Sequence, residues 1–363
     1  MGTLKKIVRK ATVLGEMGFN KGGGNINWFP GHMAAATRVI RDRLKVSDLI
    51  IEVRDARIPL SSANEDLQPV LSGKRRVIAL NKKDLANPNI MHRWIHYFDS
   101  RKQDCFSINA HSKSSVKKLL DLVEFKLKEV ISREPTLLVM VVGVPNVGKS
   151  ALINSIHQIA SARFLGEEET GHSVTITWCY SRYCWVQGVL VPSIPDIETG
   201  LKLAVAGSVK DSVVGEERIA QYLLAVLNTR GTPIHWKHLF DTETESCHQD
   251  SDDKPKYNLK DLLQKKRKPP SKSDMHYIED ITTGVQRALC TTLWEFNGNL
   301  EDEVNLGSLI DQQFEMLQKA LKIPHKASEA RTIVSKKFLI LFRTGKLGPF
   351  ILDDVPHCYG SVS

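Results

Sequence analysis

Short apolar runs alternate with segments of helical periodicity in the first half of the chain. The strand-like runs span residues 47–55, 76–80, 104–108 and 137–142. Apolar residues recur at helical spacing near 33–46, 89–99, 114–131 and 149–160. This alternation predicts an α/β fold in which a mostly parallel sheet carries helices on both faces.

The pattern changes after about residue 230. Residues 241–273 are polar and charged, with a basic run at 265–270. We expect a solvated linker there, with nucleic-acid contact or a nuclear signal as the alternatives for the basic run. From 274 to 345 the periodicity is helical throughout, which predicts a small all-helical domain.

The composition adds a size and a charge to this picture. A chain of 363 residues is long for a single core, so two domains are expected. The 50 basic and 41 acidic residues give a net charge of +9, which favours an acidic partner such as nucleic acid. The six cysteines form no C-x-x-C pair, which argues against a zinc ribbon. No apolar run approaches the length needed to span a membrane, so we expect no integral membrane segment.

The strongest chemical signal follows the apolar run 137–142. It matches the phosphate-binding pattern G-x-x-x-x-G-K-S in full, and its residues are Gly143, Val144, Pro145, Asn146, Val147, Gly148, Lys149 and Ser150, followed by Ala151. Backbone N–H groups of such a loop cradle phosphates, and the following helix points its positive end at the anion. We expect Lys149 to reach the β- and γ-phosphates and the Ser150 hydroxyl to ligate Mg²⁺.

A second motif follows the apolar run 76–80 and consists of Asn81, Lys82, Lys83 and Asp84. The Asp84 carboxylate can accept hydrogen bonds from the ring N–H and the exocyclic amine of guanine, a pairing that adenine cannot satisfy. This argues against the alternative of an ATP-using enzyme. We expect Asn81 to tie neighbouring loops together and the stem of Lys82 to lie over the base.

A third loop is expected after the apolar run 104–108. There, Asn109 and Ala110 stand where a backbone N–H is needed for the guanine carbonyl. The two main motifs are also in reverse order, because in an ordinary GTPase the phosphate loop precedes the guanine loop. The reversal indicates the same nucleotide site built from a circularly permuted chain, a cut that close chain termini make tolerable.

Further motifs carry a family resemblance. They are Trp28-Phe29-Pro30-Gly31-His32-Met33, Asp55-Ala56-Arg57-Ile58-Pro59, Glu198-Thr199-Gly200-Leu201-Lys202-Leu203-Ala204, Val214-Gly215-Glu216-Glu217 and Phe342-Arg343-Thr344-Gly345-Lys346-Leu347-Gly348. With the reversed loops, they resemble the YlqF-like circularly permuted GTPases, and above all the plant DAR GTPases and the mitochondrial ribosome-associated GTPases. The resemblance covers about residues 27–354.

The resemblance implies an activity, cofactors and partners. It implies GTP or GDP and Mg²⁺ as cofactors, GTP hydrolysis, and assistance to large ribosomal subunit assembly by a monomer whose helical domain contacts rRNA. It implies a mitochondrial location, with chloroplast and nucleolus as alternatives. In the family the histidine of W-F-P-G-H-M is proposed to orient the attacking water. Here that residue is His32, acting beside Lys149, and a purely structural His32 is the alternative.

The expected organisation follows from pattern and resemblance together. It comprises a basic tail or targeting segment at 1–26, a circularly permuted G domain at 27–230, a charged linker at 231–273 and a helical RNA-binding-like domain at 274–354. The first 21 residues are basic, with apolar residues at helical spacing. That composition is compatible with a mitochondrial presequence, and a frayed basic tail is the alternative.

The chain departs from the family after Ser150. The switch motif P-G-x-T, whose Thr binds Mg²⁺ and the γ-phosphate, is absent, and so is D-x-P-G. Residues 166–187 stand in their place, and Thr175 and Thr177 are poor positional substitutes. We therefore expect a central strand to be missing. The alternative function is a hydrolysis-deficient isoform that acts as an RNA- or ribosome-binding scaffold.

The genetic code suggests an origin for residues 166–187. Several codons can encode each of residues 175–187. When such codons are read in a frame shifted by one base, one of the peptides that they can encode contains P-G-V-T near the expected position. We hypothesise a frameshift or a displaced splice junction that also removed a strand and the D-x-P. A transcript that encodes Trp178, Tyr180 and Trp185 in frame would contradict this hypothesis.

Overall fold

The computed structural model describes residues 32–64, 68–131, 136–163, 177–180, 183–190, 192, 194–237, 272–324 and 329–356. The chain forms two compact units. An α/β unit contains the described residues from 32 to 219 and from 342 to 356, and a helical unit contains those from 220 to 341. The division falls inside two helices, α8 (Glu216–Thr229) and α12 (Ala330–Arg343).

The division differs from the expected domain boundaries at both ends of the helical part. Residues 231–237 belong to the helical unit rather than to a linker, and residues 342–356 belong to the α/β unit. Backbone hydrogen bonds explain the second difference. The N–H of Phe350 donates to the carbonyl of Leu85 at 3.1 Å, and the N–H of Leu352 donates to that of Arg57 at 2.7 Å.

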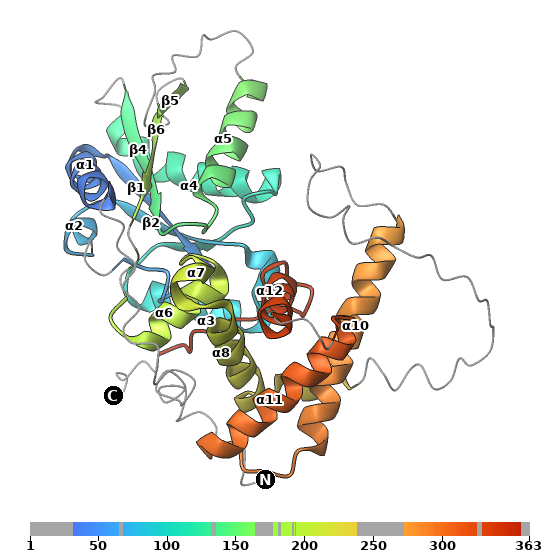
Figure 1. Cartoon of the computed structure of the whole chain (residues 1–363). Coiled ribbons are helices and arrows are strands. Elements are labelled where there is room, and N and C mark those ends of the chain that lie inside the picture. Colours follow the sequence, from blue (N-terminus) through green and yellow to red (C-terminus); the bar gives the residue numbers. More distant parts are fainter. Residues whose placement is uncertain are drawn as a thin grey trace, which may run out of the picture. The chain divides into compact units, whose positions relative to one another are not determined.

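A six-stranded sheet forms the centre of the α/β unit (Figure 1), in the order β3-β2-β1-β4-β6-β5. Its strands are β1 (Leu49–Asp55), β2 (Arg76–Asn81), β3 (Cys105–Ser107), β4 (Leu137–Gly143), β5 (Thr177–Tyr180) and β6 (Tyr183–Val189). All neighbours pair in parallel except β5, which is antiparallel to β6. The mostly parallel sheet expected from the sequence is thus confirmed.

The expected loss of a central strand is wrong. The strand β6 lies beside β4 along its whole length, from the pair Leu137–Tyr183 to the pair Gly143–Val189. Trp185 and Val186 are buried in this position. Residues 183–189 therefore supply the backbone partners that β4 needs, although residues 183–187 belong to the stretch that replaces the switch motifs. Cys184 on this strand is disulfide-bonded, which its spacing in the sequence does not predict.

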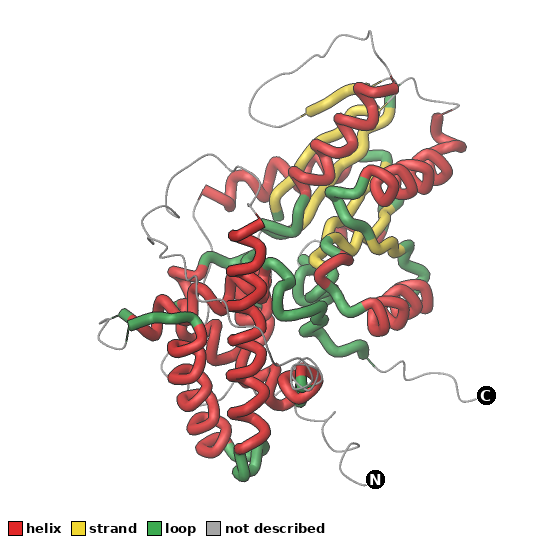
Figure 2. The backbone as a smooth tube through the Cα atoms, turned by 90° about the vertical axis from the view of Figure 1, so that its right-hand side faces the viewer, coloured by secondary structure: helices red, strands yellow, loops and turns green. Residues whose placement is uncertain are grey.

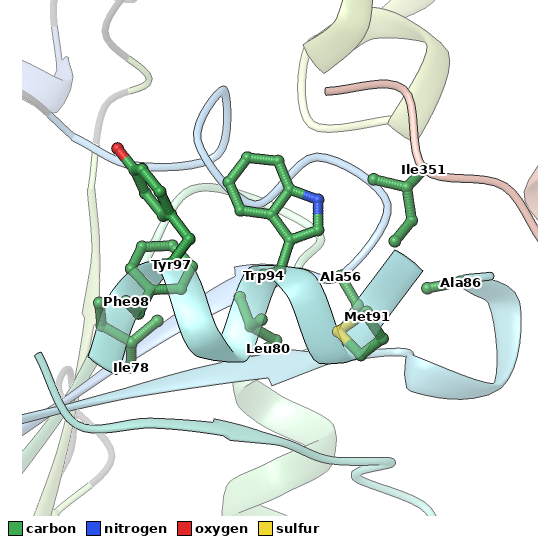
Figure 3. Packing of buried hydrophobic residues seen from close by; sticks show 9 residues of the cluster. All are labelled: Ala56, Ile78, Leu80, Ala86, Met91, Trp94, Tyr97, Phe98 and Ile351. Atoms are coloured by element: carbon green, nitrogen blue, oxygen red, sulfur yellow. The ribbon is translucent and has the colours of Figure 1, made fainter. Parts of the chain in front are cut away.

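Helices cover both faces of the sheet, as expected (Figure 1). On one face lie α1 (His32–Val46), α2 (Gln68–Ser72) and α3 (Pro88–Ser100), and on the other lie α4 (Lys113–Ile131) and α5 (Lys149–Arg163). The side chains of α3 that face the sheet are apolar and aromatic. Trp94 and Phe98 pack with Ile78 and Leu80 of β2, and Ile351 of the C-terminal segment joins the same cluster (Figure 3).

The helical unit has no strand among its described residues (Figure 2). It contains most of α8 and α12 together with η6 (Thr232–Trp236), α10 (Lys272–Glu295) and α11 (Glu303–Ala320). A buried polar pair fixes α8 against α11, because the amides of Asn228 and Gln313 exchange two hydrogen bonds of 2.8 Å. None of the described helices has the length and apolar composition needed to cross a bilayer.

The structure leaves some of the sequence expectations untested. The basic N-terminal segment and the basic run 265–270 lie outside the described residues. The same holds for Thr175 and for the side chain of Thr177.

Candidate functional site

The polar ends of the parallel strands meet at one edge of the sheet. Asp55 at the end of β1 lies opposite Asn81 at the end of β2, and Gly143 ends β4. Sites in open parallel sheets form at this edge. The two motifs that the chain carries in reverse order are therefore neighbours in space.

The phosphate loop needs glycine at both of its ends because other chain segments approach it closely. A Cβ atom on Gly143 would lie 2.3 Å from the carbonyl oxygen of Val53 in β1. A Cβ atom on Gly148, where φ is +99°, would lie 2.2 Å from the Asn81 amide nitrogen. Any larger residue would push the loop away from β1 or from Asn81.

Asn81 connects three loops, as expected from the sequence. Its Nδ2 donates to the carbonyl of Val147 in the phosphate loop at 2.8 Å. Its Oδ1 accepts from the N–H of Ala110 in the third loop at 2.9 Å. We expected a backbone N–H of this third loop to serve the guanine carbonyl, and in this structure the N–H of Ala110 donates to Asn81. Asn109 holds the same loop through its side chain, which accepts from the N–H of His111 at 2.8 Å.

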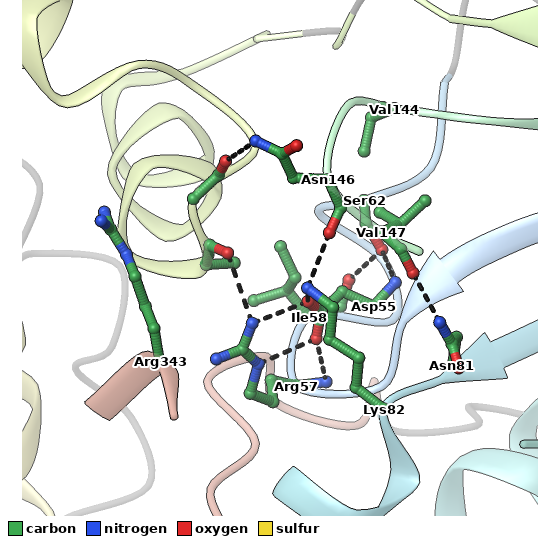
Figure 4. A network of polar contacts seen from close by, with 12 residues as sticks. Asp55, Arg57, Ile58, Ser62, Asn81, Lys82, Val144, Asn146, Val147 and Arg343 are labelled. Carbon is green, nitrogen blue, oxygen red and sulfur yellow. Dashed lines mark hydrogen bonds and ion pairs between the residues drawn. The ribbon is translucent and has the colours of Figure 1, made fainter. Parts of the chain in front are cut away.

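Lys82 connects the guanine motif to the phosphate loop. It adopts a left-handed backbone conformation, with φ of 62°. Its Nζ donates to the carbonyl of Asn146 at 2.7 Å and to the carboxylate of Asp55 at 2.9 Å (Figure 4). The side chain thus runs from the base-recognition motif towards the loop that precedes α5. Lys83 and Asp84 start the short helix η5 (Lys83–Leu85) and are exposed, so a ligand can reach the Asp84 carboxylate.

Lys149 is a buried cation that has only a neutral partner among the described residues. Its side chain lies at the start of α5, and its Nζ donates to the carbonyl of Val144 at 2.7 Å. Burial lowers the pKa of Lys149 to about 8, and repulsion from Lys82 contributes to the shift. An anion beside the Lys149 Nζ would stabilise its charged form against both burial and the repulsion from Lys82. The site therefore fits a phosphate group.

The surroundings of Ser150 fit a Mg²⁺ ion whose ligands come mostly from phosphate rather than from the protein. The Ser150 hydroxyl is exposed and accepts a hydrogen bond of 3.2 Å from the amide of Gln187 on β6. The described residues contain no cluster of His, Cys, Asp or Glu that can hold a metal ion. Mg²⁺ commonly takes few protein ligands beside substrate phosphates and water. Ala151 follows in α5 and is half-buried.

His32 is the first residue of α1, and its side chain lies outside the described residues. The structure therefore assigns no contact to it. Residues 166–176, in the stretch that replaces the switch motifs, also lie outside them.

The sequence did not predict a buried ion pair that supports both motifs. Asp55, which is fully buried, binds Arg57 through two contacts of 2.8 and 3.0 Å and also binds Lys82 (Figure 4). Burial alone would raise the pKa of Asp55, but attraction to Arg57 and Lys82 holds it well below its ordinary value. The signal was present in the sequence as the motif around residues 55–59, without an indication of its role.

Comparison with known proteins places the chain among GTPases. It is 67% identical over 369 residues to "Short integuments 2, mitochondrial" of Arabidopsis thaliana, with 98% of this chain and 95% of that protein covered. It is 36% identical to "DAR GTPase 2, mitochondrial" of the same plant, with 91% of each covered. It is 38% identical to the mouse "Mitochondrial ribosome-associated GTPase 1", with 56% of this chain and 67% of that protein covered.

The first alignment is longer than the chain itself, so that relative has residues in the aligned region that this chain lacks. No family model matches the chain. Among solved structures, GDP-bound YlqF is similar, with a TM-score of 0.49, 16% identity, and coverage of 87% of this chain and 98% of that one. Because the two plant relatives are 67% and 36% identical to it and are aligned over nearly their full length, the chain belongs to the YlqF-like family of circularly permuted GTPases.

Proposed function

We propose that this chain binds guanine nucleotide and hydrolyses GTP while it assists assembly of the large ribosomal subunit in mitochondria. The observation that carries the proposal is the bridge made by Asn81, because it holds the base-recognition motif and the phosphate loop in one site. The names of the relatives support the rest. Three are named mitochondrial, and the mouse protein is named as ribosome-associated.

Each part of the site has a separate task in this proposal. Asp84 recognises guanine, Lys149 holds the β- and γ-phosphates, and the N–H groups of residues 143–150 surround the phosphates. Ser150 contributes its hydroxyl to Mg²⁺, which when bound neutralises charge on the phosphate oxygens. His32 orients the attacking water. The monomeric protein contacts rRNA through its helical unit, as the family resemblance implies.

The missing switch motifs favour one second candidate. Without the Thr of P-G-x-T and the Asp of D-x-P-G, two groups that usually support Mg²⁺ and the γ-phosphate are absent from the sequence. A protein that binds guanine nucleotide and the ribosomal subunit without hydrolysis would act as a scaffold.

Turnover measurements separate the two candidates. GTP hydrolysis by the purified protein is measured with and without large ribosomal subunits, beside binding of a fluorescent GDP analogue. We expect nucleotide binding, and turnover that rises when subunits are added. Binding without any subunit-stimulated turnover would favour the scaffold, and absence of nucleotide binding would contradict both.

The pKa of Lys149 predicts how nucleotide affinity depends on pH. In the free protein this lysine loses its proton near pH 8, whereas bound phosphate keeps it charged. Affinity for the fluorescent GDP analogue is therefore expected to fall above pH 8, by about tenfold at pH 9. A titration series from pH 7 to 9 tests this. The control is Lys149→Arg, whose guanidinium stays charged and whose affinity should not follow the same pH profile.

The same shift has a consequence for stability. Because the folded pKa of Lys149 lies below its ordinary value of 10.5, the unfolded chain binds more protons between pH 8 and 10.5. The contribution of this residue to the stability of the free protein is unfavourable below pH 8 and becomes less so as the pH rises through that interval.

A further inference from the structure

Four consecutive carbonyl groups at the carboxyl end of α6 (Ile197–Ala206) accept hydrogen bonds from side chains. The carbonyls of Ala204 and Val205 accept from Arg343, at 2.6 and 2.9 Å. The carbonyl of Ala206 accepts from Arg57 at 3.3 Å, and that of Gly207 accepts from Asn146 at 2.7 Å. A helix leaves its last carbonyls without intrahelical donors, so these side chains cap it.

The three donors come from segments that are far apart in the sequence. Asn146 belongs to the phosphate loop, Arg57 to the loop after β1, and Arg343 to the end of α12. Two of them are guanidinium groups, which are favourable at the negative end of a helix dipole. Arg343 also holds Asp211 of α7 (Asp211–Val214) through both carboxylate oxygens, at 2.6 and 2.8 Å.

The phosphate loop and the guanine motif are joined to the same cap. The carbonyl of Asn146 accepts from Lys82, Lys82 shares the Asp55 carboxylate with Arg57, and Arg57 reaches α6 (Figure 4). These bonds close a ring that contains both nucleotide motifs and the end of α6. The Arg57 guanidinium also lies over the ring of Phe342, 5.8 Å from its centroid.

Building on the proposed nucleotide binding, we propose that the carboxyl end of α6 couples the phosphate loop to the C-terminal segment 343–352. Nucleotide bound in the loop then orders this segment. Phosphate in the loop fixes the backbone of Asn146, and through Gly207 it fixes the end of α6. Arg343 binds that end through two carbonyl groups, those of Ala204 and Val205, so the Arg343 side chain is fixed at the same time. This makes Arg343 a positioning residue for the phosphate loop, because coupling between two sites is reciprocal.

Nucleotide affinity and hydrogen exchange of the full-length protein test the coupling together. In the wild type, the fluorescent GDP analogue is expected to increase amide protection in 204–211 and in 343–352. In Arg343→Ala, affinity should fall about tenfold and the gain of protection in 343–352 should disappear. Arg343→Lys should recover part of both, because lysine keeps the charge but not the geometry of the guanidinium.

A second arginine on α12 gives the matched control. Arg331 pairs with Asp311 at 2.6 Å in the helical unit, and Arg331→Ala should leave affinity and protection as in the wild type. If Arg343→Ala does not fold, Asp211→Asn replaces it. That variant weakens the contact between Arg343 and residue 211 without removing the bonds of Arg343 to α6. Its affinity for the GDP analogue should therefore fall by less than tenfold.

The coupling and the proposed function can fail separately in these experiments. Wild-type affinity in Arg343→Ala, or nucleotide-induced protection that stops at the phosphate loop, would overturn the coupling. A wild-type protein that does not bind the GDP analogue would instead contradict the proposed function.

Discussion

Asp84→Asn is expected to lower the affinity for guanine nucleotides by about 10²- to 10⁴-fold, since two charge-assisted hydrogen bonds contribute about 1.5–3 kcal/mol each. Asp84 is exposed at the start of η5, so the substitution should leave the fold intact. The amide of asparagine still accepts one hydrogen bond but presents a donor to the second guanine donor. Titration with a fluorescent GDP analogue measures the loss.

Xanthine nucleotides supply the decisive control for this variant. Xanthine has a carbonyl where guanine has its exocyclic amine, so Asp84→Asn should bind xanthosine diphosphate better than the wild type does. Asp121→Asn changes another exposed aspartate, which lies on α4, and should alter neither affinity. Unchanged GDP affinity in Asp84→Asn would contradict the assignment of this motif to the base.

Elements in which two independent signals agree could be predicted from the sequence. The runs that became β1, β2 and β4 are each apolar and end in a polar or glycine residue at a motif, so their position and their carboxyl ends followed directly. The same agreement placed the start of α5 at the end of the phosphate loop, where the helix begins at Lys149. Parallel pairing then brought Asn81 and the phosphate loop together, which the reversed order of the motifs already indicated.

The contacts that support the site depend on residues that are distant in sequence, and local pattern does not show them. The capping of α6 joins Asn146, Arg57 and Arg343, and no periodicity relates these positions. The sequence places the C-terminal segment in the helical domain because helical periodicity continues to residue 345 and the family resemblance to about residue 354. Its return to the α/β unit depends on backbone bonds of Phe350 and Leu352 with loops that lie far earlier in the chain.

The strand β6 shows the limit of reasoning from motifs. The absence of D-x-P-G predicted a gap in the sheet, but residues 183–189 can pair with β4 because backbone groups pair irrespective of sequence. Side chains decide whether the strand is tolerated, and Trp185 and Val186 are apolar where the sheet is buried. A family motif therefore reports on the chemistry of the switch, and it does not determine whether a strand forms.

Arg57→Met is expected to destabilise the protein by about 3–5 kcal/mol, since removing one partner of a buried ion pair leaves the other charge without compensation. Asp55 is fully buried, and Lys82 alone then neutralises it. Urea denaturation at pH 7 measures the loss. The matched control is Lys45→Met, which removes the exposed pair of Lys45 with Asp42 and should change stability by about 0–1 kcal/mol.

The effect of Arg57→Met should also depend on pH, in a direction set by Asp55. Burial alone would raise the pKa of Asp55, but Arg57 and Lys82 hold it below its ordinary value of 3.8. The carboxylate therefore contributes stability that is present above pH 3.8 and is lost as the pH falls towards its folded pKa. Without Arg57, burial raises the pKa of Asp55, and the stability that the ionised Asp55 carboxylate contributes becomes smaller. The stability difference between the wild type and the variant should thus narrow below pH 3.8, and a constant difference would show that Arg57 acts through packing rather than through Asp55.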